Sequence, residues 1–149
     1  NMSKQYPNLV FKELSEVKQM RDCLPIINQL YPKITIEKFE IATAEMIKRG
    51  GYKMLAAYQD NEMVAVCGYY ISYMLYCGRY LQFCNLVVDK KFRNQGIGKE
   101  IISYLEKKAR ELDCDKIVLD SYVQNEKSHS LYYESDFYIR GFHFMRDLT

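Results

Sequence analysis

A short glycine turn, Arg93-Asn94-Gln95-Gly96-Ile97-Gly98, limits what this chain can fold into more than any other stretch. An apolar strand pattern ends before it at Val88, and an amphipathic helix pattern starts inside it. Glycine lets the backbone approach another group closely, and the first amides of the following helix have no partners within that helix. These amides also lie at the positive end of the helix dipole. The sequence therefore predicts a seat for an anionic group where the helix begins.

The segments after the turn predict a helix, a strand and a second, short helix. Apolar residues recur at helical spacing over 97–112, an apolar strand follows over 116–122, and the short helix covers 126–135. A connection of this length requires the strands on either side of the first helix to be parallel, with a right-handed crossover. The tail over 138–148 alternates loosely, and we expect it to close the sheet.

The first third of the chain predicts one strand and two helices. The strand covers 8–14, and Ser15 caps a helix that is interrupted at Pro25. Thr35 caps the next helix, which ends at Gly50-Gly51. We expect the buried side of this second helix to consist of its apolar residues Ile36, Phe39, Ile41, Ala44, Met46 and Ile47.

Three strands joined by short turns are predicted between that helix and the glycine turn. They cover 52–59, 63–75 and 79–88, and such short connections make neighbouring strands antiparallel. Gly68, inside the middle strand, indicates a bulge or a close approach of other backbone. The whole pattern predicts one α/β domain over 1–149, with a mixed, mostly antiparallel twisted sheet, one parallel strand pair and about four flanking helices.

Composition supports one domain and argues against several kinds of partner. A chain of 149 residues that is 48% hydrophobic is large enough for a single core. A net charge of +2 gives no field that would favour nucleic acid or an anionic membrane. Neither a signal peptide nor a run near the ~20 apolar residues of a membrane span is seen, so we expect a cytoplasmic protein without membrane or nucleic-acid partners.

Cysteine and histidine are too sparse to indicate a metal centre. The five cysteines are odd in number and lack CxxC spacing, which favours free thiols in a reducing compartment. The two histidines, His129 and His143, have no ligand spacing around them. We therefore predict no metal site.

The glycine turn has three possible interpretations. A nucleotide P-loop is excluded because Arg93 and Glu100 occupy the positions of its first glycine and its Ser or Thr. A dinucleotide fingerprint would need a third glycine where Ile101 stands, and its strand would open a βαβ unit. A turn that serves only helix geometry stays open on these residues alone.

Residues downstream of the turn extend the pattern. Leu86-x-Val88 is followed by Phe92-Arg93-x-x-Gly96-x-Gly98, then by Asn125-x-x-Ser128-x-x-Leu131-Tyr132 and by Phe137. This arrangement resembles the signature of the GNAT superfamily of acetyl-CoA-dependent N-acetyltransferases, which is R/Q-x-x-G-x-G/A after an apolar strand and a later N-x-x-A-x-x-L-Y-E-x-x-G-F. The order of the predicted elements along the chain is similar to that family's as well.

The resemblance implies an acetyl-CoA site where the parallel strand pair splays apart. Amides over 95–99 would hold the pyrophosphate, with Arg93 and Gly96 shaping the loop, and the strand over 86–88 would hydrogen-bond the pantetheine arm. Asn125 would contact the pantetheine. The implied catalytic residues are Tyr132, as general acid, and Val88, whose amide would polarise the thioester carbonyl. The implied cofactor-binding residues are Leu86, Val87, Val88, Arg93, Asn94, Gln95, Gly96, Ile97, Gly98, Lys99, Asn125 and Tyr132.

The same resemblance implies direct attack of an amine on the acetyl thioester while both are bound. With ordinary pKa values of about 8.5 for a thiol and about 10 for tyrosine, proton donation by Tyr132 is uphill by roughly 2 kcal/mol. Concerted donation or a lowered tyrosine pKa would remove that cost. Departures from the family pattern lie at Lys90, Ser128, Tyr133 and Asp136; none is expected to touch the chemistry directly, although Asp136 affects a turn.

The group that deprotonates the amine is not identified by the pattern. Some relatives carry a glutamate eleven residues before the motif, where this chain has Gln82, which cannot act as a base. Glu45, Asp120 and His143 are unranked candidates. The leading hypothesis is an N-acetyltransferase, monomeric or homodimeric, that acts on a small-molecule or peptide primary amine. The alternative, favoured by Gln82, is a non-catalytic acyl-CoA-binding sensor or interaction domain.

Overall fold

One sheet of five strands forms the centre of the computed structural model, which describes residues 9–149. The strands lie in sequence order across the sheet, and neighbours are antiparallel except for the last pair, which is parallel. Their bounds are β1 Leu9–Leu14, β2 Lys53–Gln59, β3 Glu62–Met74, β4 Gly78–Val88 and β5 Lys116–Val118. The predicted mixed sheet with one parallel pair is confirmed, while residue 8 of the first predicted strand lies outside the described residues.

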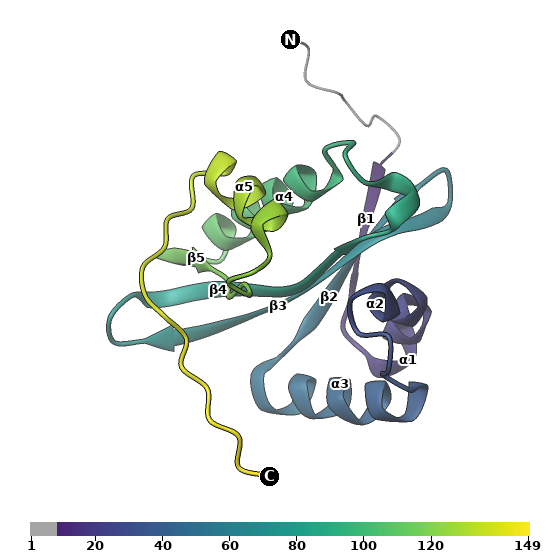
Figure 1. Cartoon of the computed structure of the whole chain (residues 1–149), viewed down its shortest axis with the longest axis horizontal. Helices are drawn as coiled ribbons and strands as arrows, with labels where there is room; N and C mark the ends of the chain where they lie inside the picture. The colour runs from purple at the N-terminus through teal and green to yellow at the C-terminus, as the bar shows by residue number, and fades with distance from the viewer. Residues whose placement is uncertain (1–8) are drawn as a thin grey trace.

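Helices cover both faces of the sheet and make it the middle of three layers (Figure 1). On one face lie α4 Ile97–Glu111 and α5 Glu126–Glu134. On the other lie α1 Val17–Met20, α2 Leu24–Leu30 and α3 Ile36–Gly50, with the 3-10 turn η1 Arg21–Cys23 between the first two. A second 3-10 turn, η2 Lys90–Phe92, follows β4. None of the helices within residues 9–149 is long and apolar enough to cross a membrane.

Each face of the sheet has its own buried cluster, because side chains alternate along the strands. Phe83 and Leu105 belong to the cluster under α4, which we call the donor face. Met20 and Met54 belong to the cluster under α1 and α2, which we call the acceptor face.

The first helical segment is interrupted as predicted, but its cap is one residue later. Pro25 occupies the first turn of α2, where its missing N–H costs nothing, and η1 separates this turn from α1. Glu16, and not Ser15, is the N-cap of α1. The side chain of Gln19 accepts hydrogen bonds from the amides of both Ser15 (3.0 Å) and Glu16 (3.1 Å), which fixes the start of the helix.

The predicted cap and end of α3 are confirmed, whereas its predicted buried side is confirmed only at Phe39 and, in part, at Ile47. Thr35 accepts a hydrogen bond from the Lys38 amide, and Gly51 ends the helix in the left-handed conformation. Phe39 and Thr43 are the buried residues of α3. Four of the six expected residues, Ile36, Ile41, Ala44 and Met46, are exposed. The reason is that α3 packs against the rest of the protein only along a line of residues four apart, which includes Phe39 and Thr43. The other apolar residues of the helix therefore face solvent.

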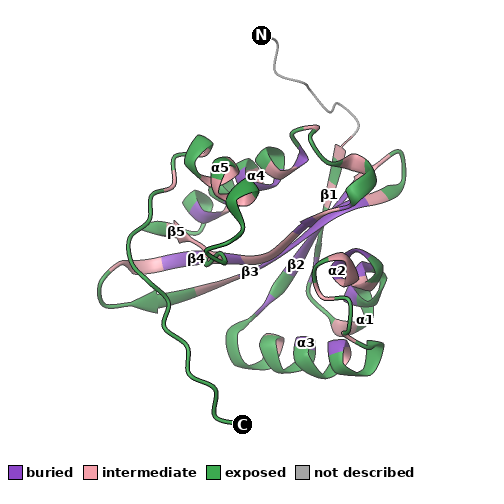
Figure 2. Ribbon diagram, in the orientation of Figure 1, coloured by how far each residue is buried: buried purple, intermediate pink, exposed green. Residues whose placement is uncertain are grey.

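The C-terminal part of the sheet is shorter than predicted. β5 ends at Val118 instead of Tyr122, because its pairing with β4 stops at Gln82. Residues 138–149 were expected to close the sheet, but they form no strand and remain exposed along their length (Figure 2). The sheet therefore ends at β5 in the described part of the chain.

Candidate active site

The second half of β4 has an open edge. β5 pairs with β4 only at Tyr80–Gln82, so within the described residues the stretch 83–88 has a strand neighbour on the β3 side alone. The Asp89 amide donates to the Val64 carbonyl at 2.8 Å, which directs it toward β3. Because amides alternate along a strand, those of Leu86 and Val88 point to the open edge, whereas that of Val87 points to β3. The edge thus offers amides to an extended ligand.

The end of β4 is tied to the glycine turn by side chains of both segments. The Arg93 Nε donates to the Val88 carbonyl at 3.1 Å, on the same open edge. Asp89 accepts a hydrogen bond from the Lys91 amide and caps η2. The Lys90 amide donates to the Gln29 Oε1 at 3.0 Å, a bond that could not be made by proline, the residue common at this position in the family. The departure from the family pattern at Lys90 therefore has a structural reason.

The glycine turn reaches α4 through two left-handed residues, Asn94 (φ 62°) and Gly96 (φ 84°). The Glu100 amide bonds to the Gly96 carbonyl at 3.2 Å, and helix geometry leaves the amides of residues 97–99 without intrahelical acceptors. These amides, at the positive end of a helix of 15 residues, have the chemistry that a pyrophosphate requires. The open edge of β4 likewise suits the amide groups of a pantetheine arm. The residues present therefore fit acetyl-CoA.

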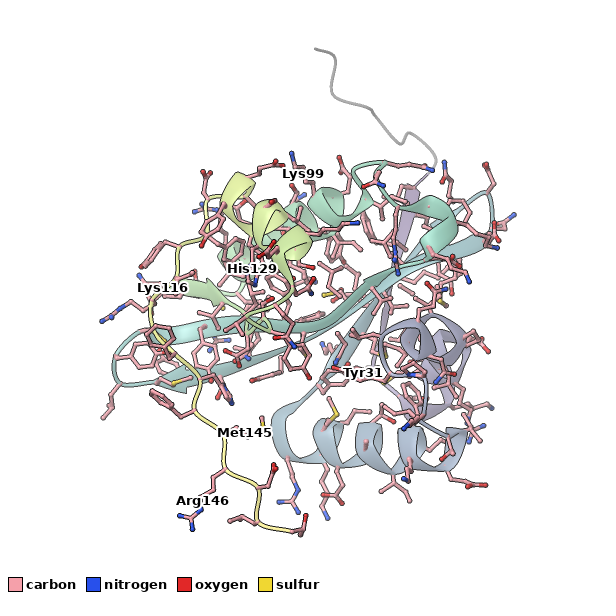
Figure 3. All side chains as sticks on the ribbon, in the orientation of Figure 1. Tyr31, Lys99, Lys116, His129, Met145 and Arg146 are labelled. Atoms are coloured by element: carbon pink, nitrogen blue, oxygen red, sulfur yellow. The ribbon has the colours of Figure 1, made fainter. Side chains whose placement is uncertain are left out.

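Gly98 and Lys99 both connect α4 to α5. A Cβ on Gly98 would lie 3.1 Å from the Leu131 side chain, so this glycine allows the two helices to pack closely. The Lys99 ammonium lies 2.8 Å from the Glu134 carboxylate, and Figure 3 shows Lys99 on the donor side of the sheet. The turn thus has a packing role in addition to its predicted role in phosphate binding.

Tyr132, the predicted acid, is half-buried on α5 within an aromatic cluster. Its ring packs edge-on against Phe83 and Phe137, with centroids 6.2 Å away in each case. Burial raises the pKa of Tyr132, Cys67 adds to this shift, and a hydrogen bond with the Ser128 hydroxyl opposes it. A lowered pKa is thus not the route by which this phenol becomes a better acid. Ser128 touches the predicted acid, contrary to the expectation that the departures from the family pattern stand apart from it.

Two other motif residues, Asn125 and Asp136, lie at the two ends of α5. Asn125 begins α5, but its side chain forms no cap hydrogen bond with the helix, and the residue is exposed. Asp136 adopts a left-handed φ of 67°, the conformation that the family's glycine would supply. The turn at Asp136 is therefore preserved, because aspartate tolerates this conformation better than most residues.

A bulge in β4, opposite Gly68 of β3, changes which residues face which side of the sheet. The register between β3 and β4 shifts between Val66 and Gly68, and Asn85 has a φ of 53°. The Asn85 amide donates to the Tyr31 hydroxyl at 3.1 Å and accepts from the Tyr52 hydroxyl at 3.0 Å. The Tyr52 ring occupies the space that a side chain at position 68 would need, which explains Gly68. Gly68 was one signal of this irregularity, and an asparagine inside an apolar strand was a second.

Three of the four residues considered for deprotonation meet on the acceptor face. The Gln82 Nε2 and the His143 Nδ1 both lie 3.3 Å from the Asp120 Oδ2. Glu45 lies elsewhere, on α3, where Arg49 is 2.6 Å from it. The structure thus joins β4, the end of β5 and the tail at one point, on the side of the sheet opposite the helix that carries Tyr132.

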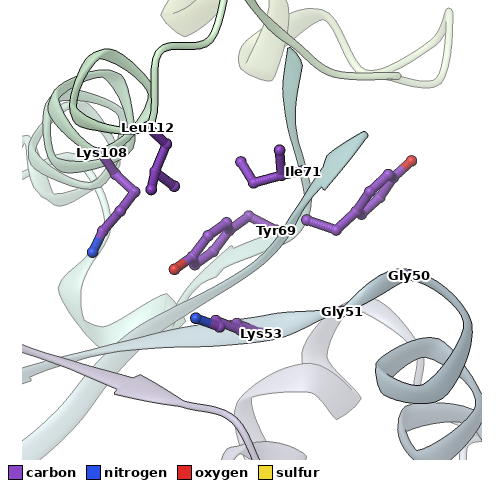
Figure 4. Close-up of a pocket in the computed structure, with 8 residues that line it drawn as sticks. Gly50, Gly51, Lys53, Tyr69, Ile71, Lys108 and Leu112 are labelled. Atoms are coloured by element: carbon purple, nitrogen blue, oxygen red, sulfur yellow. The ribbon is translucent and has the colours of Figure 1, made fainter. Parts of the chain in front are cut away.

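A separate hollow of about 240 Å³ lies between α3, β3 and the end of α4 (Figure 4). Beside it, Glu13 accepts hydrogen bonds from the Tyr69 hydroxyl and, at 2.8 Å, from the Lys108 ammonium. This network holds α4 against β1 and β3. The residues that line the hollow are Gly50, Gly51, Lys53, Tyr69, Tyr70, Ile71, Lys108 and Leu112. None of the predicted site residues is among them.

Comparisons with known proteins agree with the fold. The model of the Acetyltransferase (GNAT) family matches residues 20–137. The chain is 24% identical over 121 residues to YhdJ of Bacillus subtilis, named as an uncharacterized N-acetyltransferase, and this covers 81% of the chain and 85% of the relative. A 50-residue segment, 34% of each protein, is 32% identical to glucosamine 6-phosphate N-acetyltransferase of Arabidopsis thaliana.

Solved structures share the fold at low sequence identity. An aminoglycoside acetyltransferase from an uncultured soil metagenomic sample, in complex with sisomicin, has a TM-score of 0.80 at 15% identity, over 95% of this chain and 97% of the other. The ribosomal-protein-alanine N-acetyltransferase of Brucella melitensis has a TM-score of 0.78 at 19% identity, over 95% and 99%. The family match spans most of the chain, and the described fold agrees with it. The chain therefore belongs to the GNAT family of acetyl-CoA-dependent acetyltransferases.

Proposed function

We propose that this chain transfers an acetyl group from acetyl-CoA to a primary amine by direct attack, with both substrates bound. One observation carries the proposal: the open edge of β4 is accessible between two chemically different faces. Tyr132 lies on the donor face, whereas Gln82, Asp120 and His143 meet on the acceptor face. The amine can therefore lose its proton on one side of β4, and the leaving thiolate can gain a proton on the other.

The donor would be held by backbone groups over two segments. The amides of Leu86 and Val88 would bond the pantetheine arm as an added strand does, and the amides over 95–99 would hold the pyrophosphate. Arg93 and the left-handed Asn94 would keep the loop in place. Acetyl-CoA supplies an acetyl thioester, and the rest of the chemistry falls to the protein.

The Val88 amide would stabilise the negative charge that develops on the thioester oxygen. It points to the open edge, and its rigid strand keeps it oriented without reorganisation. Loss of one such donor typically costs about 10²–10³ in kcat. The Leu86 amide points the same way and would hold the neighbouring amide group.

Tyr132 would protonate the departing thiolate. Donation from an ordinary tyrosine to an ordinary thiolate is uphill by roughly 2 kcal/mol, and burial of Tyr132 increases this cost by raising its pKa. Stepwise transfer to a free thiolate is therefore unfavourable. The proton would move as the C–S bond breaks, so that no fully formed thiolate precedes it.

The adjacent tyrosines of α5 provide a matched test. Tyr132 is half-buried in the aromatic cluster, while Tyr133 is 54% exposed. We expect Tyr132→Phe to lower thiol release strongly across a panel of amines with acetyl-CoA affinity retained, and Tyr133→Phe to leave the rate unchanged. Equal rates for Tyr132→Phe and the unaltered chain would remove Tyr132 from the acid role.

A non-catalytic acyl-CoA-binding domain is the second candidate function, because Gln82 replaces the glutamate of some relatives. A thermal shift addresses binding: acetyl-CoA at 100 times its Kd should add about 2.7 kcal/mol of stability. Binding without thiol release on a broad panel of amines and peptides would favour this candidate. Absence of any shift at millimolar acetyl-CoA would contradict both functions.

A further inference from the structure

The contact between Asp120 and His143 places a carboxylate behind an imidazole on the acceptor face. Ile117 and Leu119 pack against the donor-face cluster, so Asp120, the next residue, is directed to the other side of the sheet. Its Oδ2 is 3.3 Å from both the Gln82 Nε2 and the His143 Nδ1. An amide and an imidazole thus converge on one oxygen from β4 and from the tail.

This arrangement favours one distribution of protons on the imidazole. The His143 Nδ1 lies 3.3 Å from a carboxylate oxygen, and a carboxylate accepts hydrogen bonds and does not donate them, so a proton on Nδ1 is the favoured state of the neutral ring. In the neutral ring the Nε2 is then left with its lone pair. Gln82 donates to the same carboxylate and holds it in place. His143 therefore has one nitrogen available to accept a proton.

Two other titratable groups face Asp120 from β3 and β4. Burial, and then nearby groups that include Asp120, raise the pKa of Tyr70 to about 12. Burial and the Asp120 charge raise the pKa of Cys84 to about 11. Both groups keep their protons near neutral pH, so neither competes with the imidazole for a proton from a substrate.

We infer that His143 is the proton acceptor for the substrate amine and that Asp120 is its positioning residue. This inference rests on the proposed function. The His143 Nε2 takes one proton from the substrate ammonium, and the nitrogen lone pair then forms the C–N bond as the C–S bond breaks. The thiolate gains a proton from Tyr132, and the second proton of the amine nitrogen restores the Tyr132 phenol. The balance is ammonium plus thioester giving amide, thiol and one proton, which is the proton on His143.

The substrate that needs such a proton acceptor is an aliphatic primary amine. An amine with a pKa of about 10.4 is neutral in roughly one molecule in 2,500 at pH 7, whereas an α-amine near 7.7 needs little help. The thioester oxygen would lie at the Val88 amide, six residues after Gln82 and ~20 Å along an extended strand, so the proton crosses several bridging waters to reach the imidazole. Glu45 cannot substitute, since it pairs with Arg49 on α3.

The tautomer of His143 can be measured without any substrate. The chain has two histidines, and the His129 Nε2 lies 2.9 Å from the Tyr122 carbonyl, which only accepts. Nitrogen-detected NMR of the full chain above the imidazole titration should therefore show opposite tautomers, Nε2–H for His129 and Nδ1–H for His143. Asp120→Asn should remove the preference at His143 alone. An Nε2–H tautomer at His143 in the unaltered chain would overturn the inference.

Kinetics test the role itself. With an alkyl amine at pH 7, His143→Gln should lower kcat/KM by about 10²–10⁴ and replace a plateau with a rate that still rises at pH 9. Asp120→Asn should cause a smaller loss, Glu45→Gln none, and the acetyl-CoA thermal shift should be the same in all. Turnover by the unaltered chain with no effect of His143→Gln would overturn the dyad alone. Absence of turnover in the unaltered chain would overturn the proposed function, and the proton-accepting role with it.

Discussion

Replacement of Asn85 should reveal how much the β4 bulge depends on one side chain. Its amide bonds the hydroxyls of Tyr31 and Tyr52, and Tyr52 is only 4% exposed. Each such bond contributes about 1 kcal/mol net, so Asn85→Gly, which keeps the left-handed backbone, should lower the free energy of unfolding by about 2 kcal/mol. Asn85→Ala adds about 1 kcal/mol for a left-handed residue with a Cβ. For this chain length the two changes correspond to Tm losses of roughly 6 and 9 °C.

Asn61, in a hairpin turn, serves as a control that separates the hydrogen-bond contribution of Asn85 from the cost of its left-handed backbone. It also has a left-handed φ, of 64°, but it lies in the exposed turn between β2 and β3. Urea unfolding should therefore give Asn61→Gly a stability close to that of the unaltered chain and Asn61→Ala a loss of about 1 kcal/mol. If Asn85→Gly unfolds at the same urea midpoint as the unaltered chain, the reasoning about the hydrogen-bonded bulge is refuted.

Two further predictions concern the packing of the sheet, at Glu13 against α4 and at Gly68 against Tyr52. Glu13 is partly buried, which raises its pKa, but hydrogen bonds from Lys108 and Tyr69 outweigh this and leave the pKa lowered. The ionised carboxylate therefore adds stability above its unfolded pKa of about 4.5, and this stability is lost as the pH falls through the lower folded pKa. For Glu13→Gln, the urea midpoint should fall less steeply between pH 7 and pH 3 than it does for the unaltered chain. Gly68→Ala would place a Cβ in the Tyr52 ring, and calorimetry should show a loss of about 1–3 kcal/mol, whereas unchanged stability would contradict the close approach.

Local signals in the sequence were sufficient for most of the elements. Asp60 and Asn61 both adopt the left-handed conformation of a tight hairpin, as two such residues between apolar strands predict. Helical spacing identified α4, whose predicted apolar residues are buried apart from Leu112. The parallel pairing of β4 and β5 followed from the length of the connection, which only a crossover can satisfy.

Features that depend on distant partners were not predictable in the same way. The apolar residues of α3 define a face, but no local rule says that only a stripe through Phe39 and Thr43 meets the body. Asn85 depends on two tyrosines more than 30 residues away in the sequence. The meeting of Asp120 with His143 requires the β4–β5 register and the path of the tail, neither of which periodicity determines.

The contacts of Asp120 with Gln82 and His143 give a reason for glutamine, and not glutamate, at position 82. A glutamate at position 82 would place a second carboxylate about as close to Asp120 as the Gln82 amide now lies, at 3.3 Å. Two carboxylates at that separation would repel each other, and the hydrogen bond that Gln82 now donates would be lost. Gln82 instead donates a hydrogen bond and leaves the Asp120 charge available to the His143 Nδ1. In the proposed mechanism, the residue that seemed to remove the base is therefore the one that allows a different base to work.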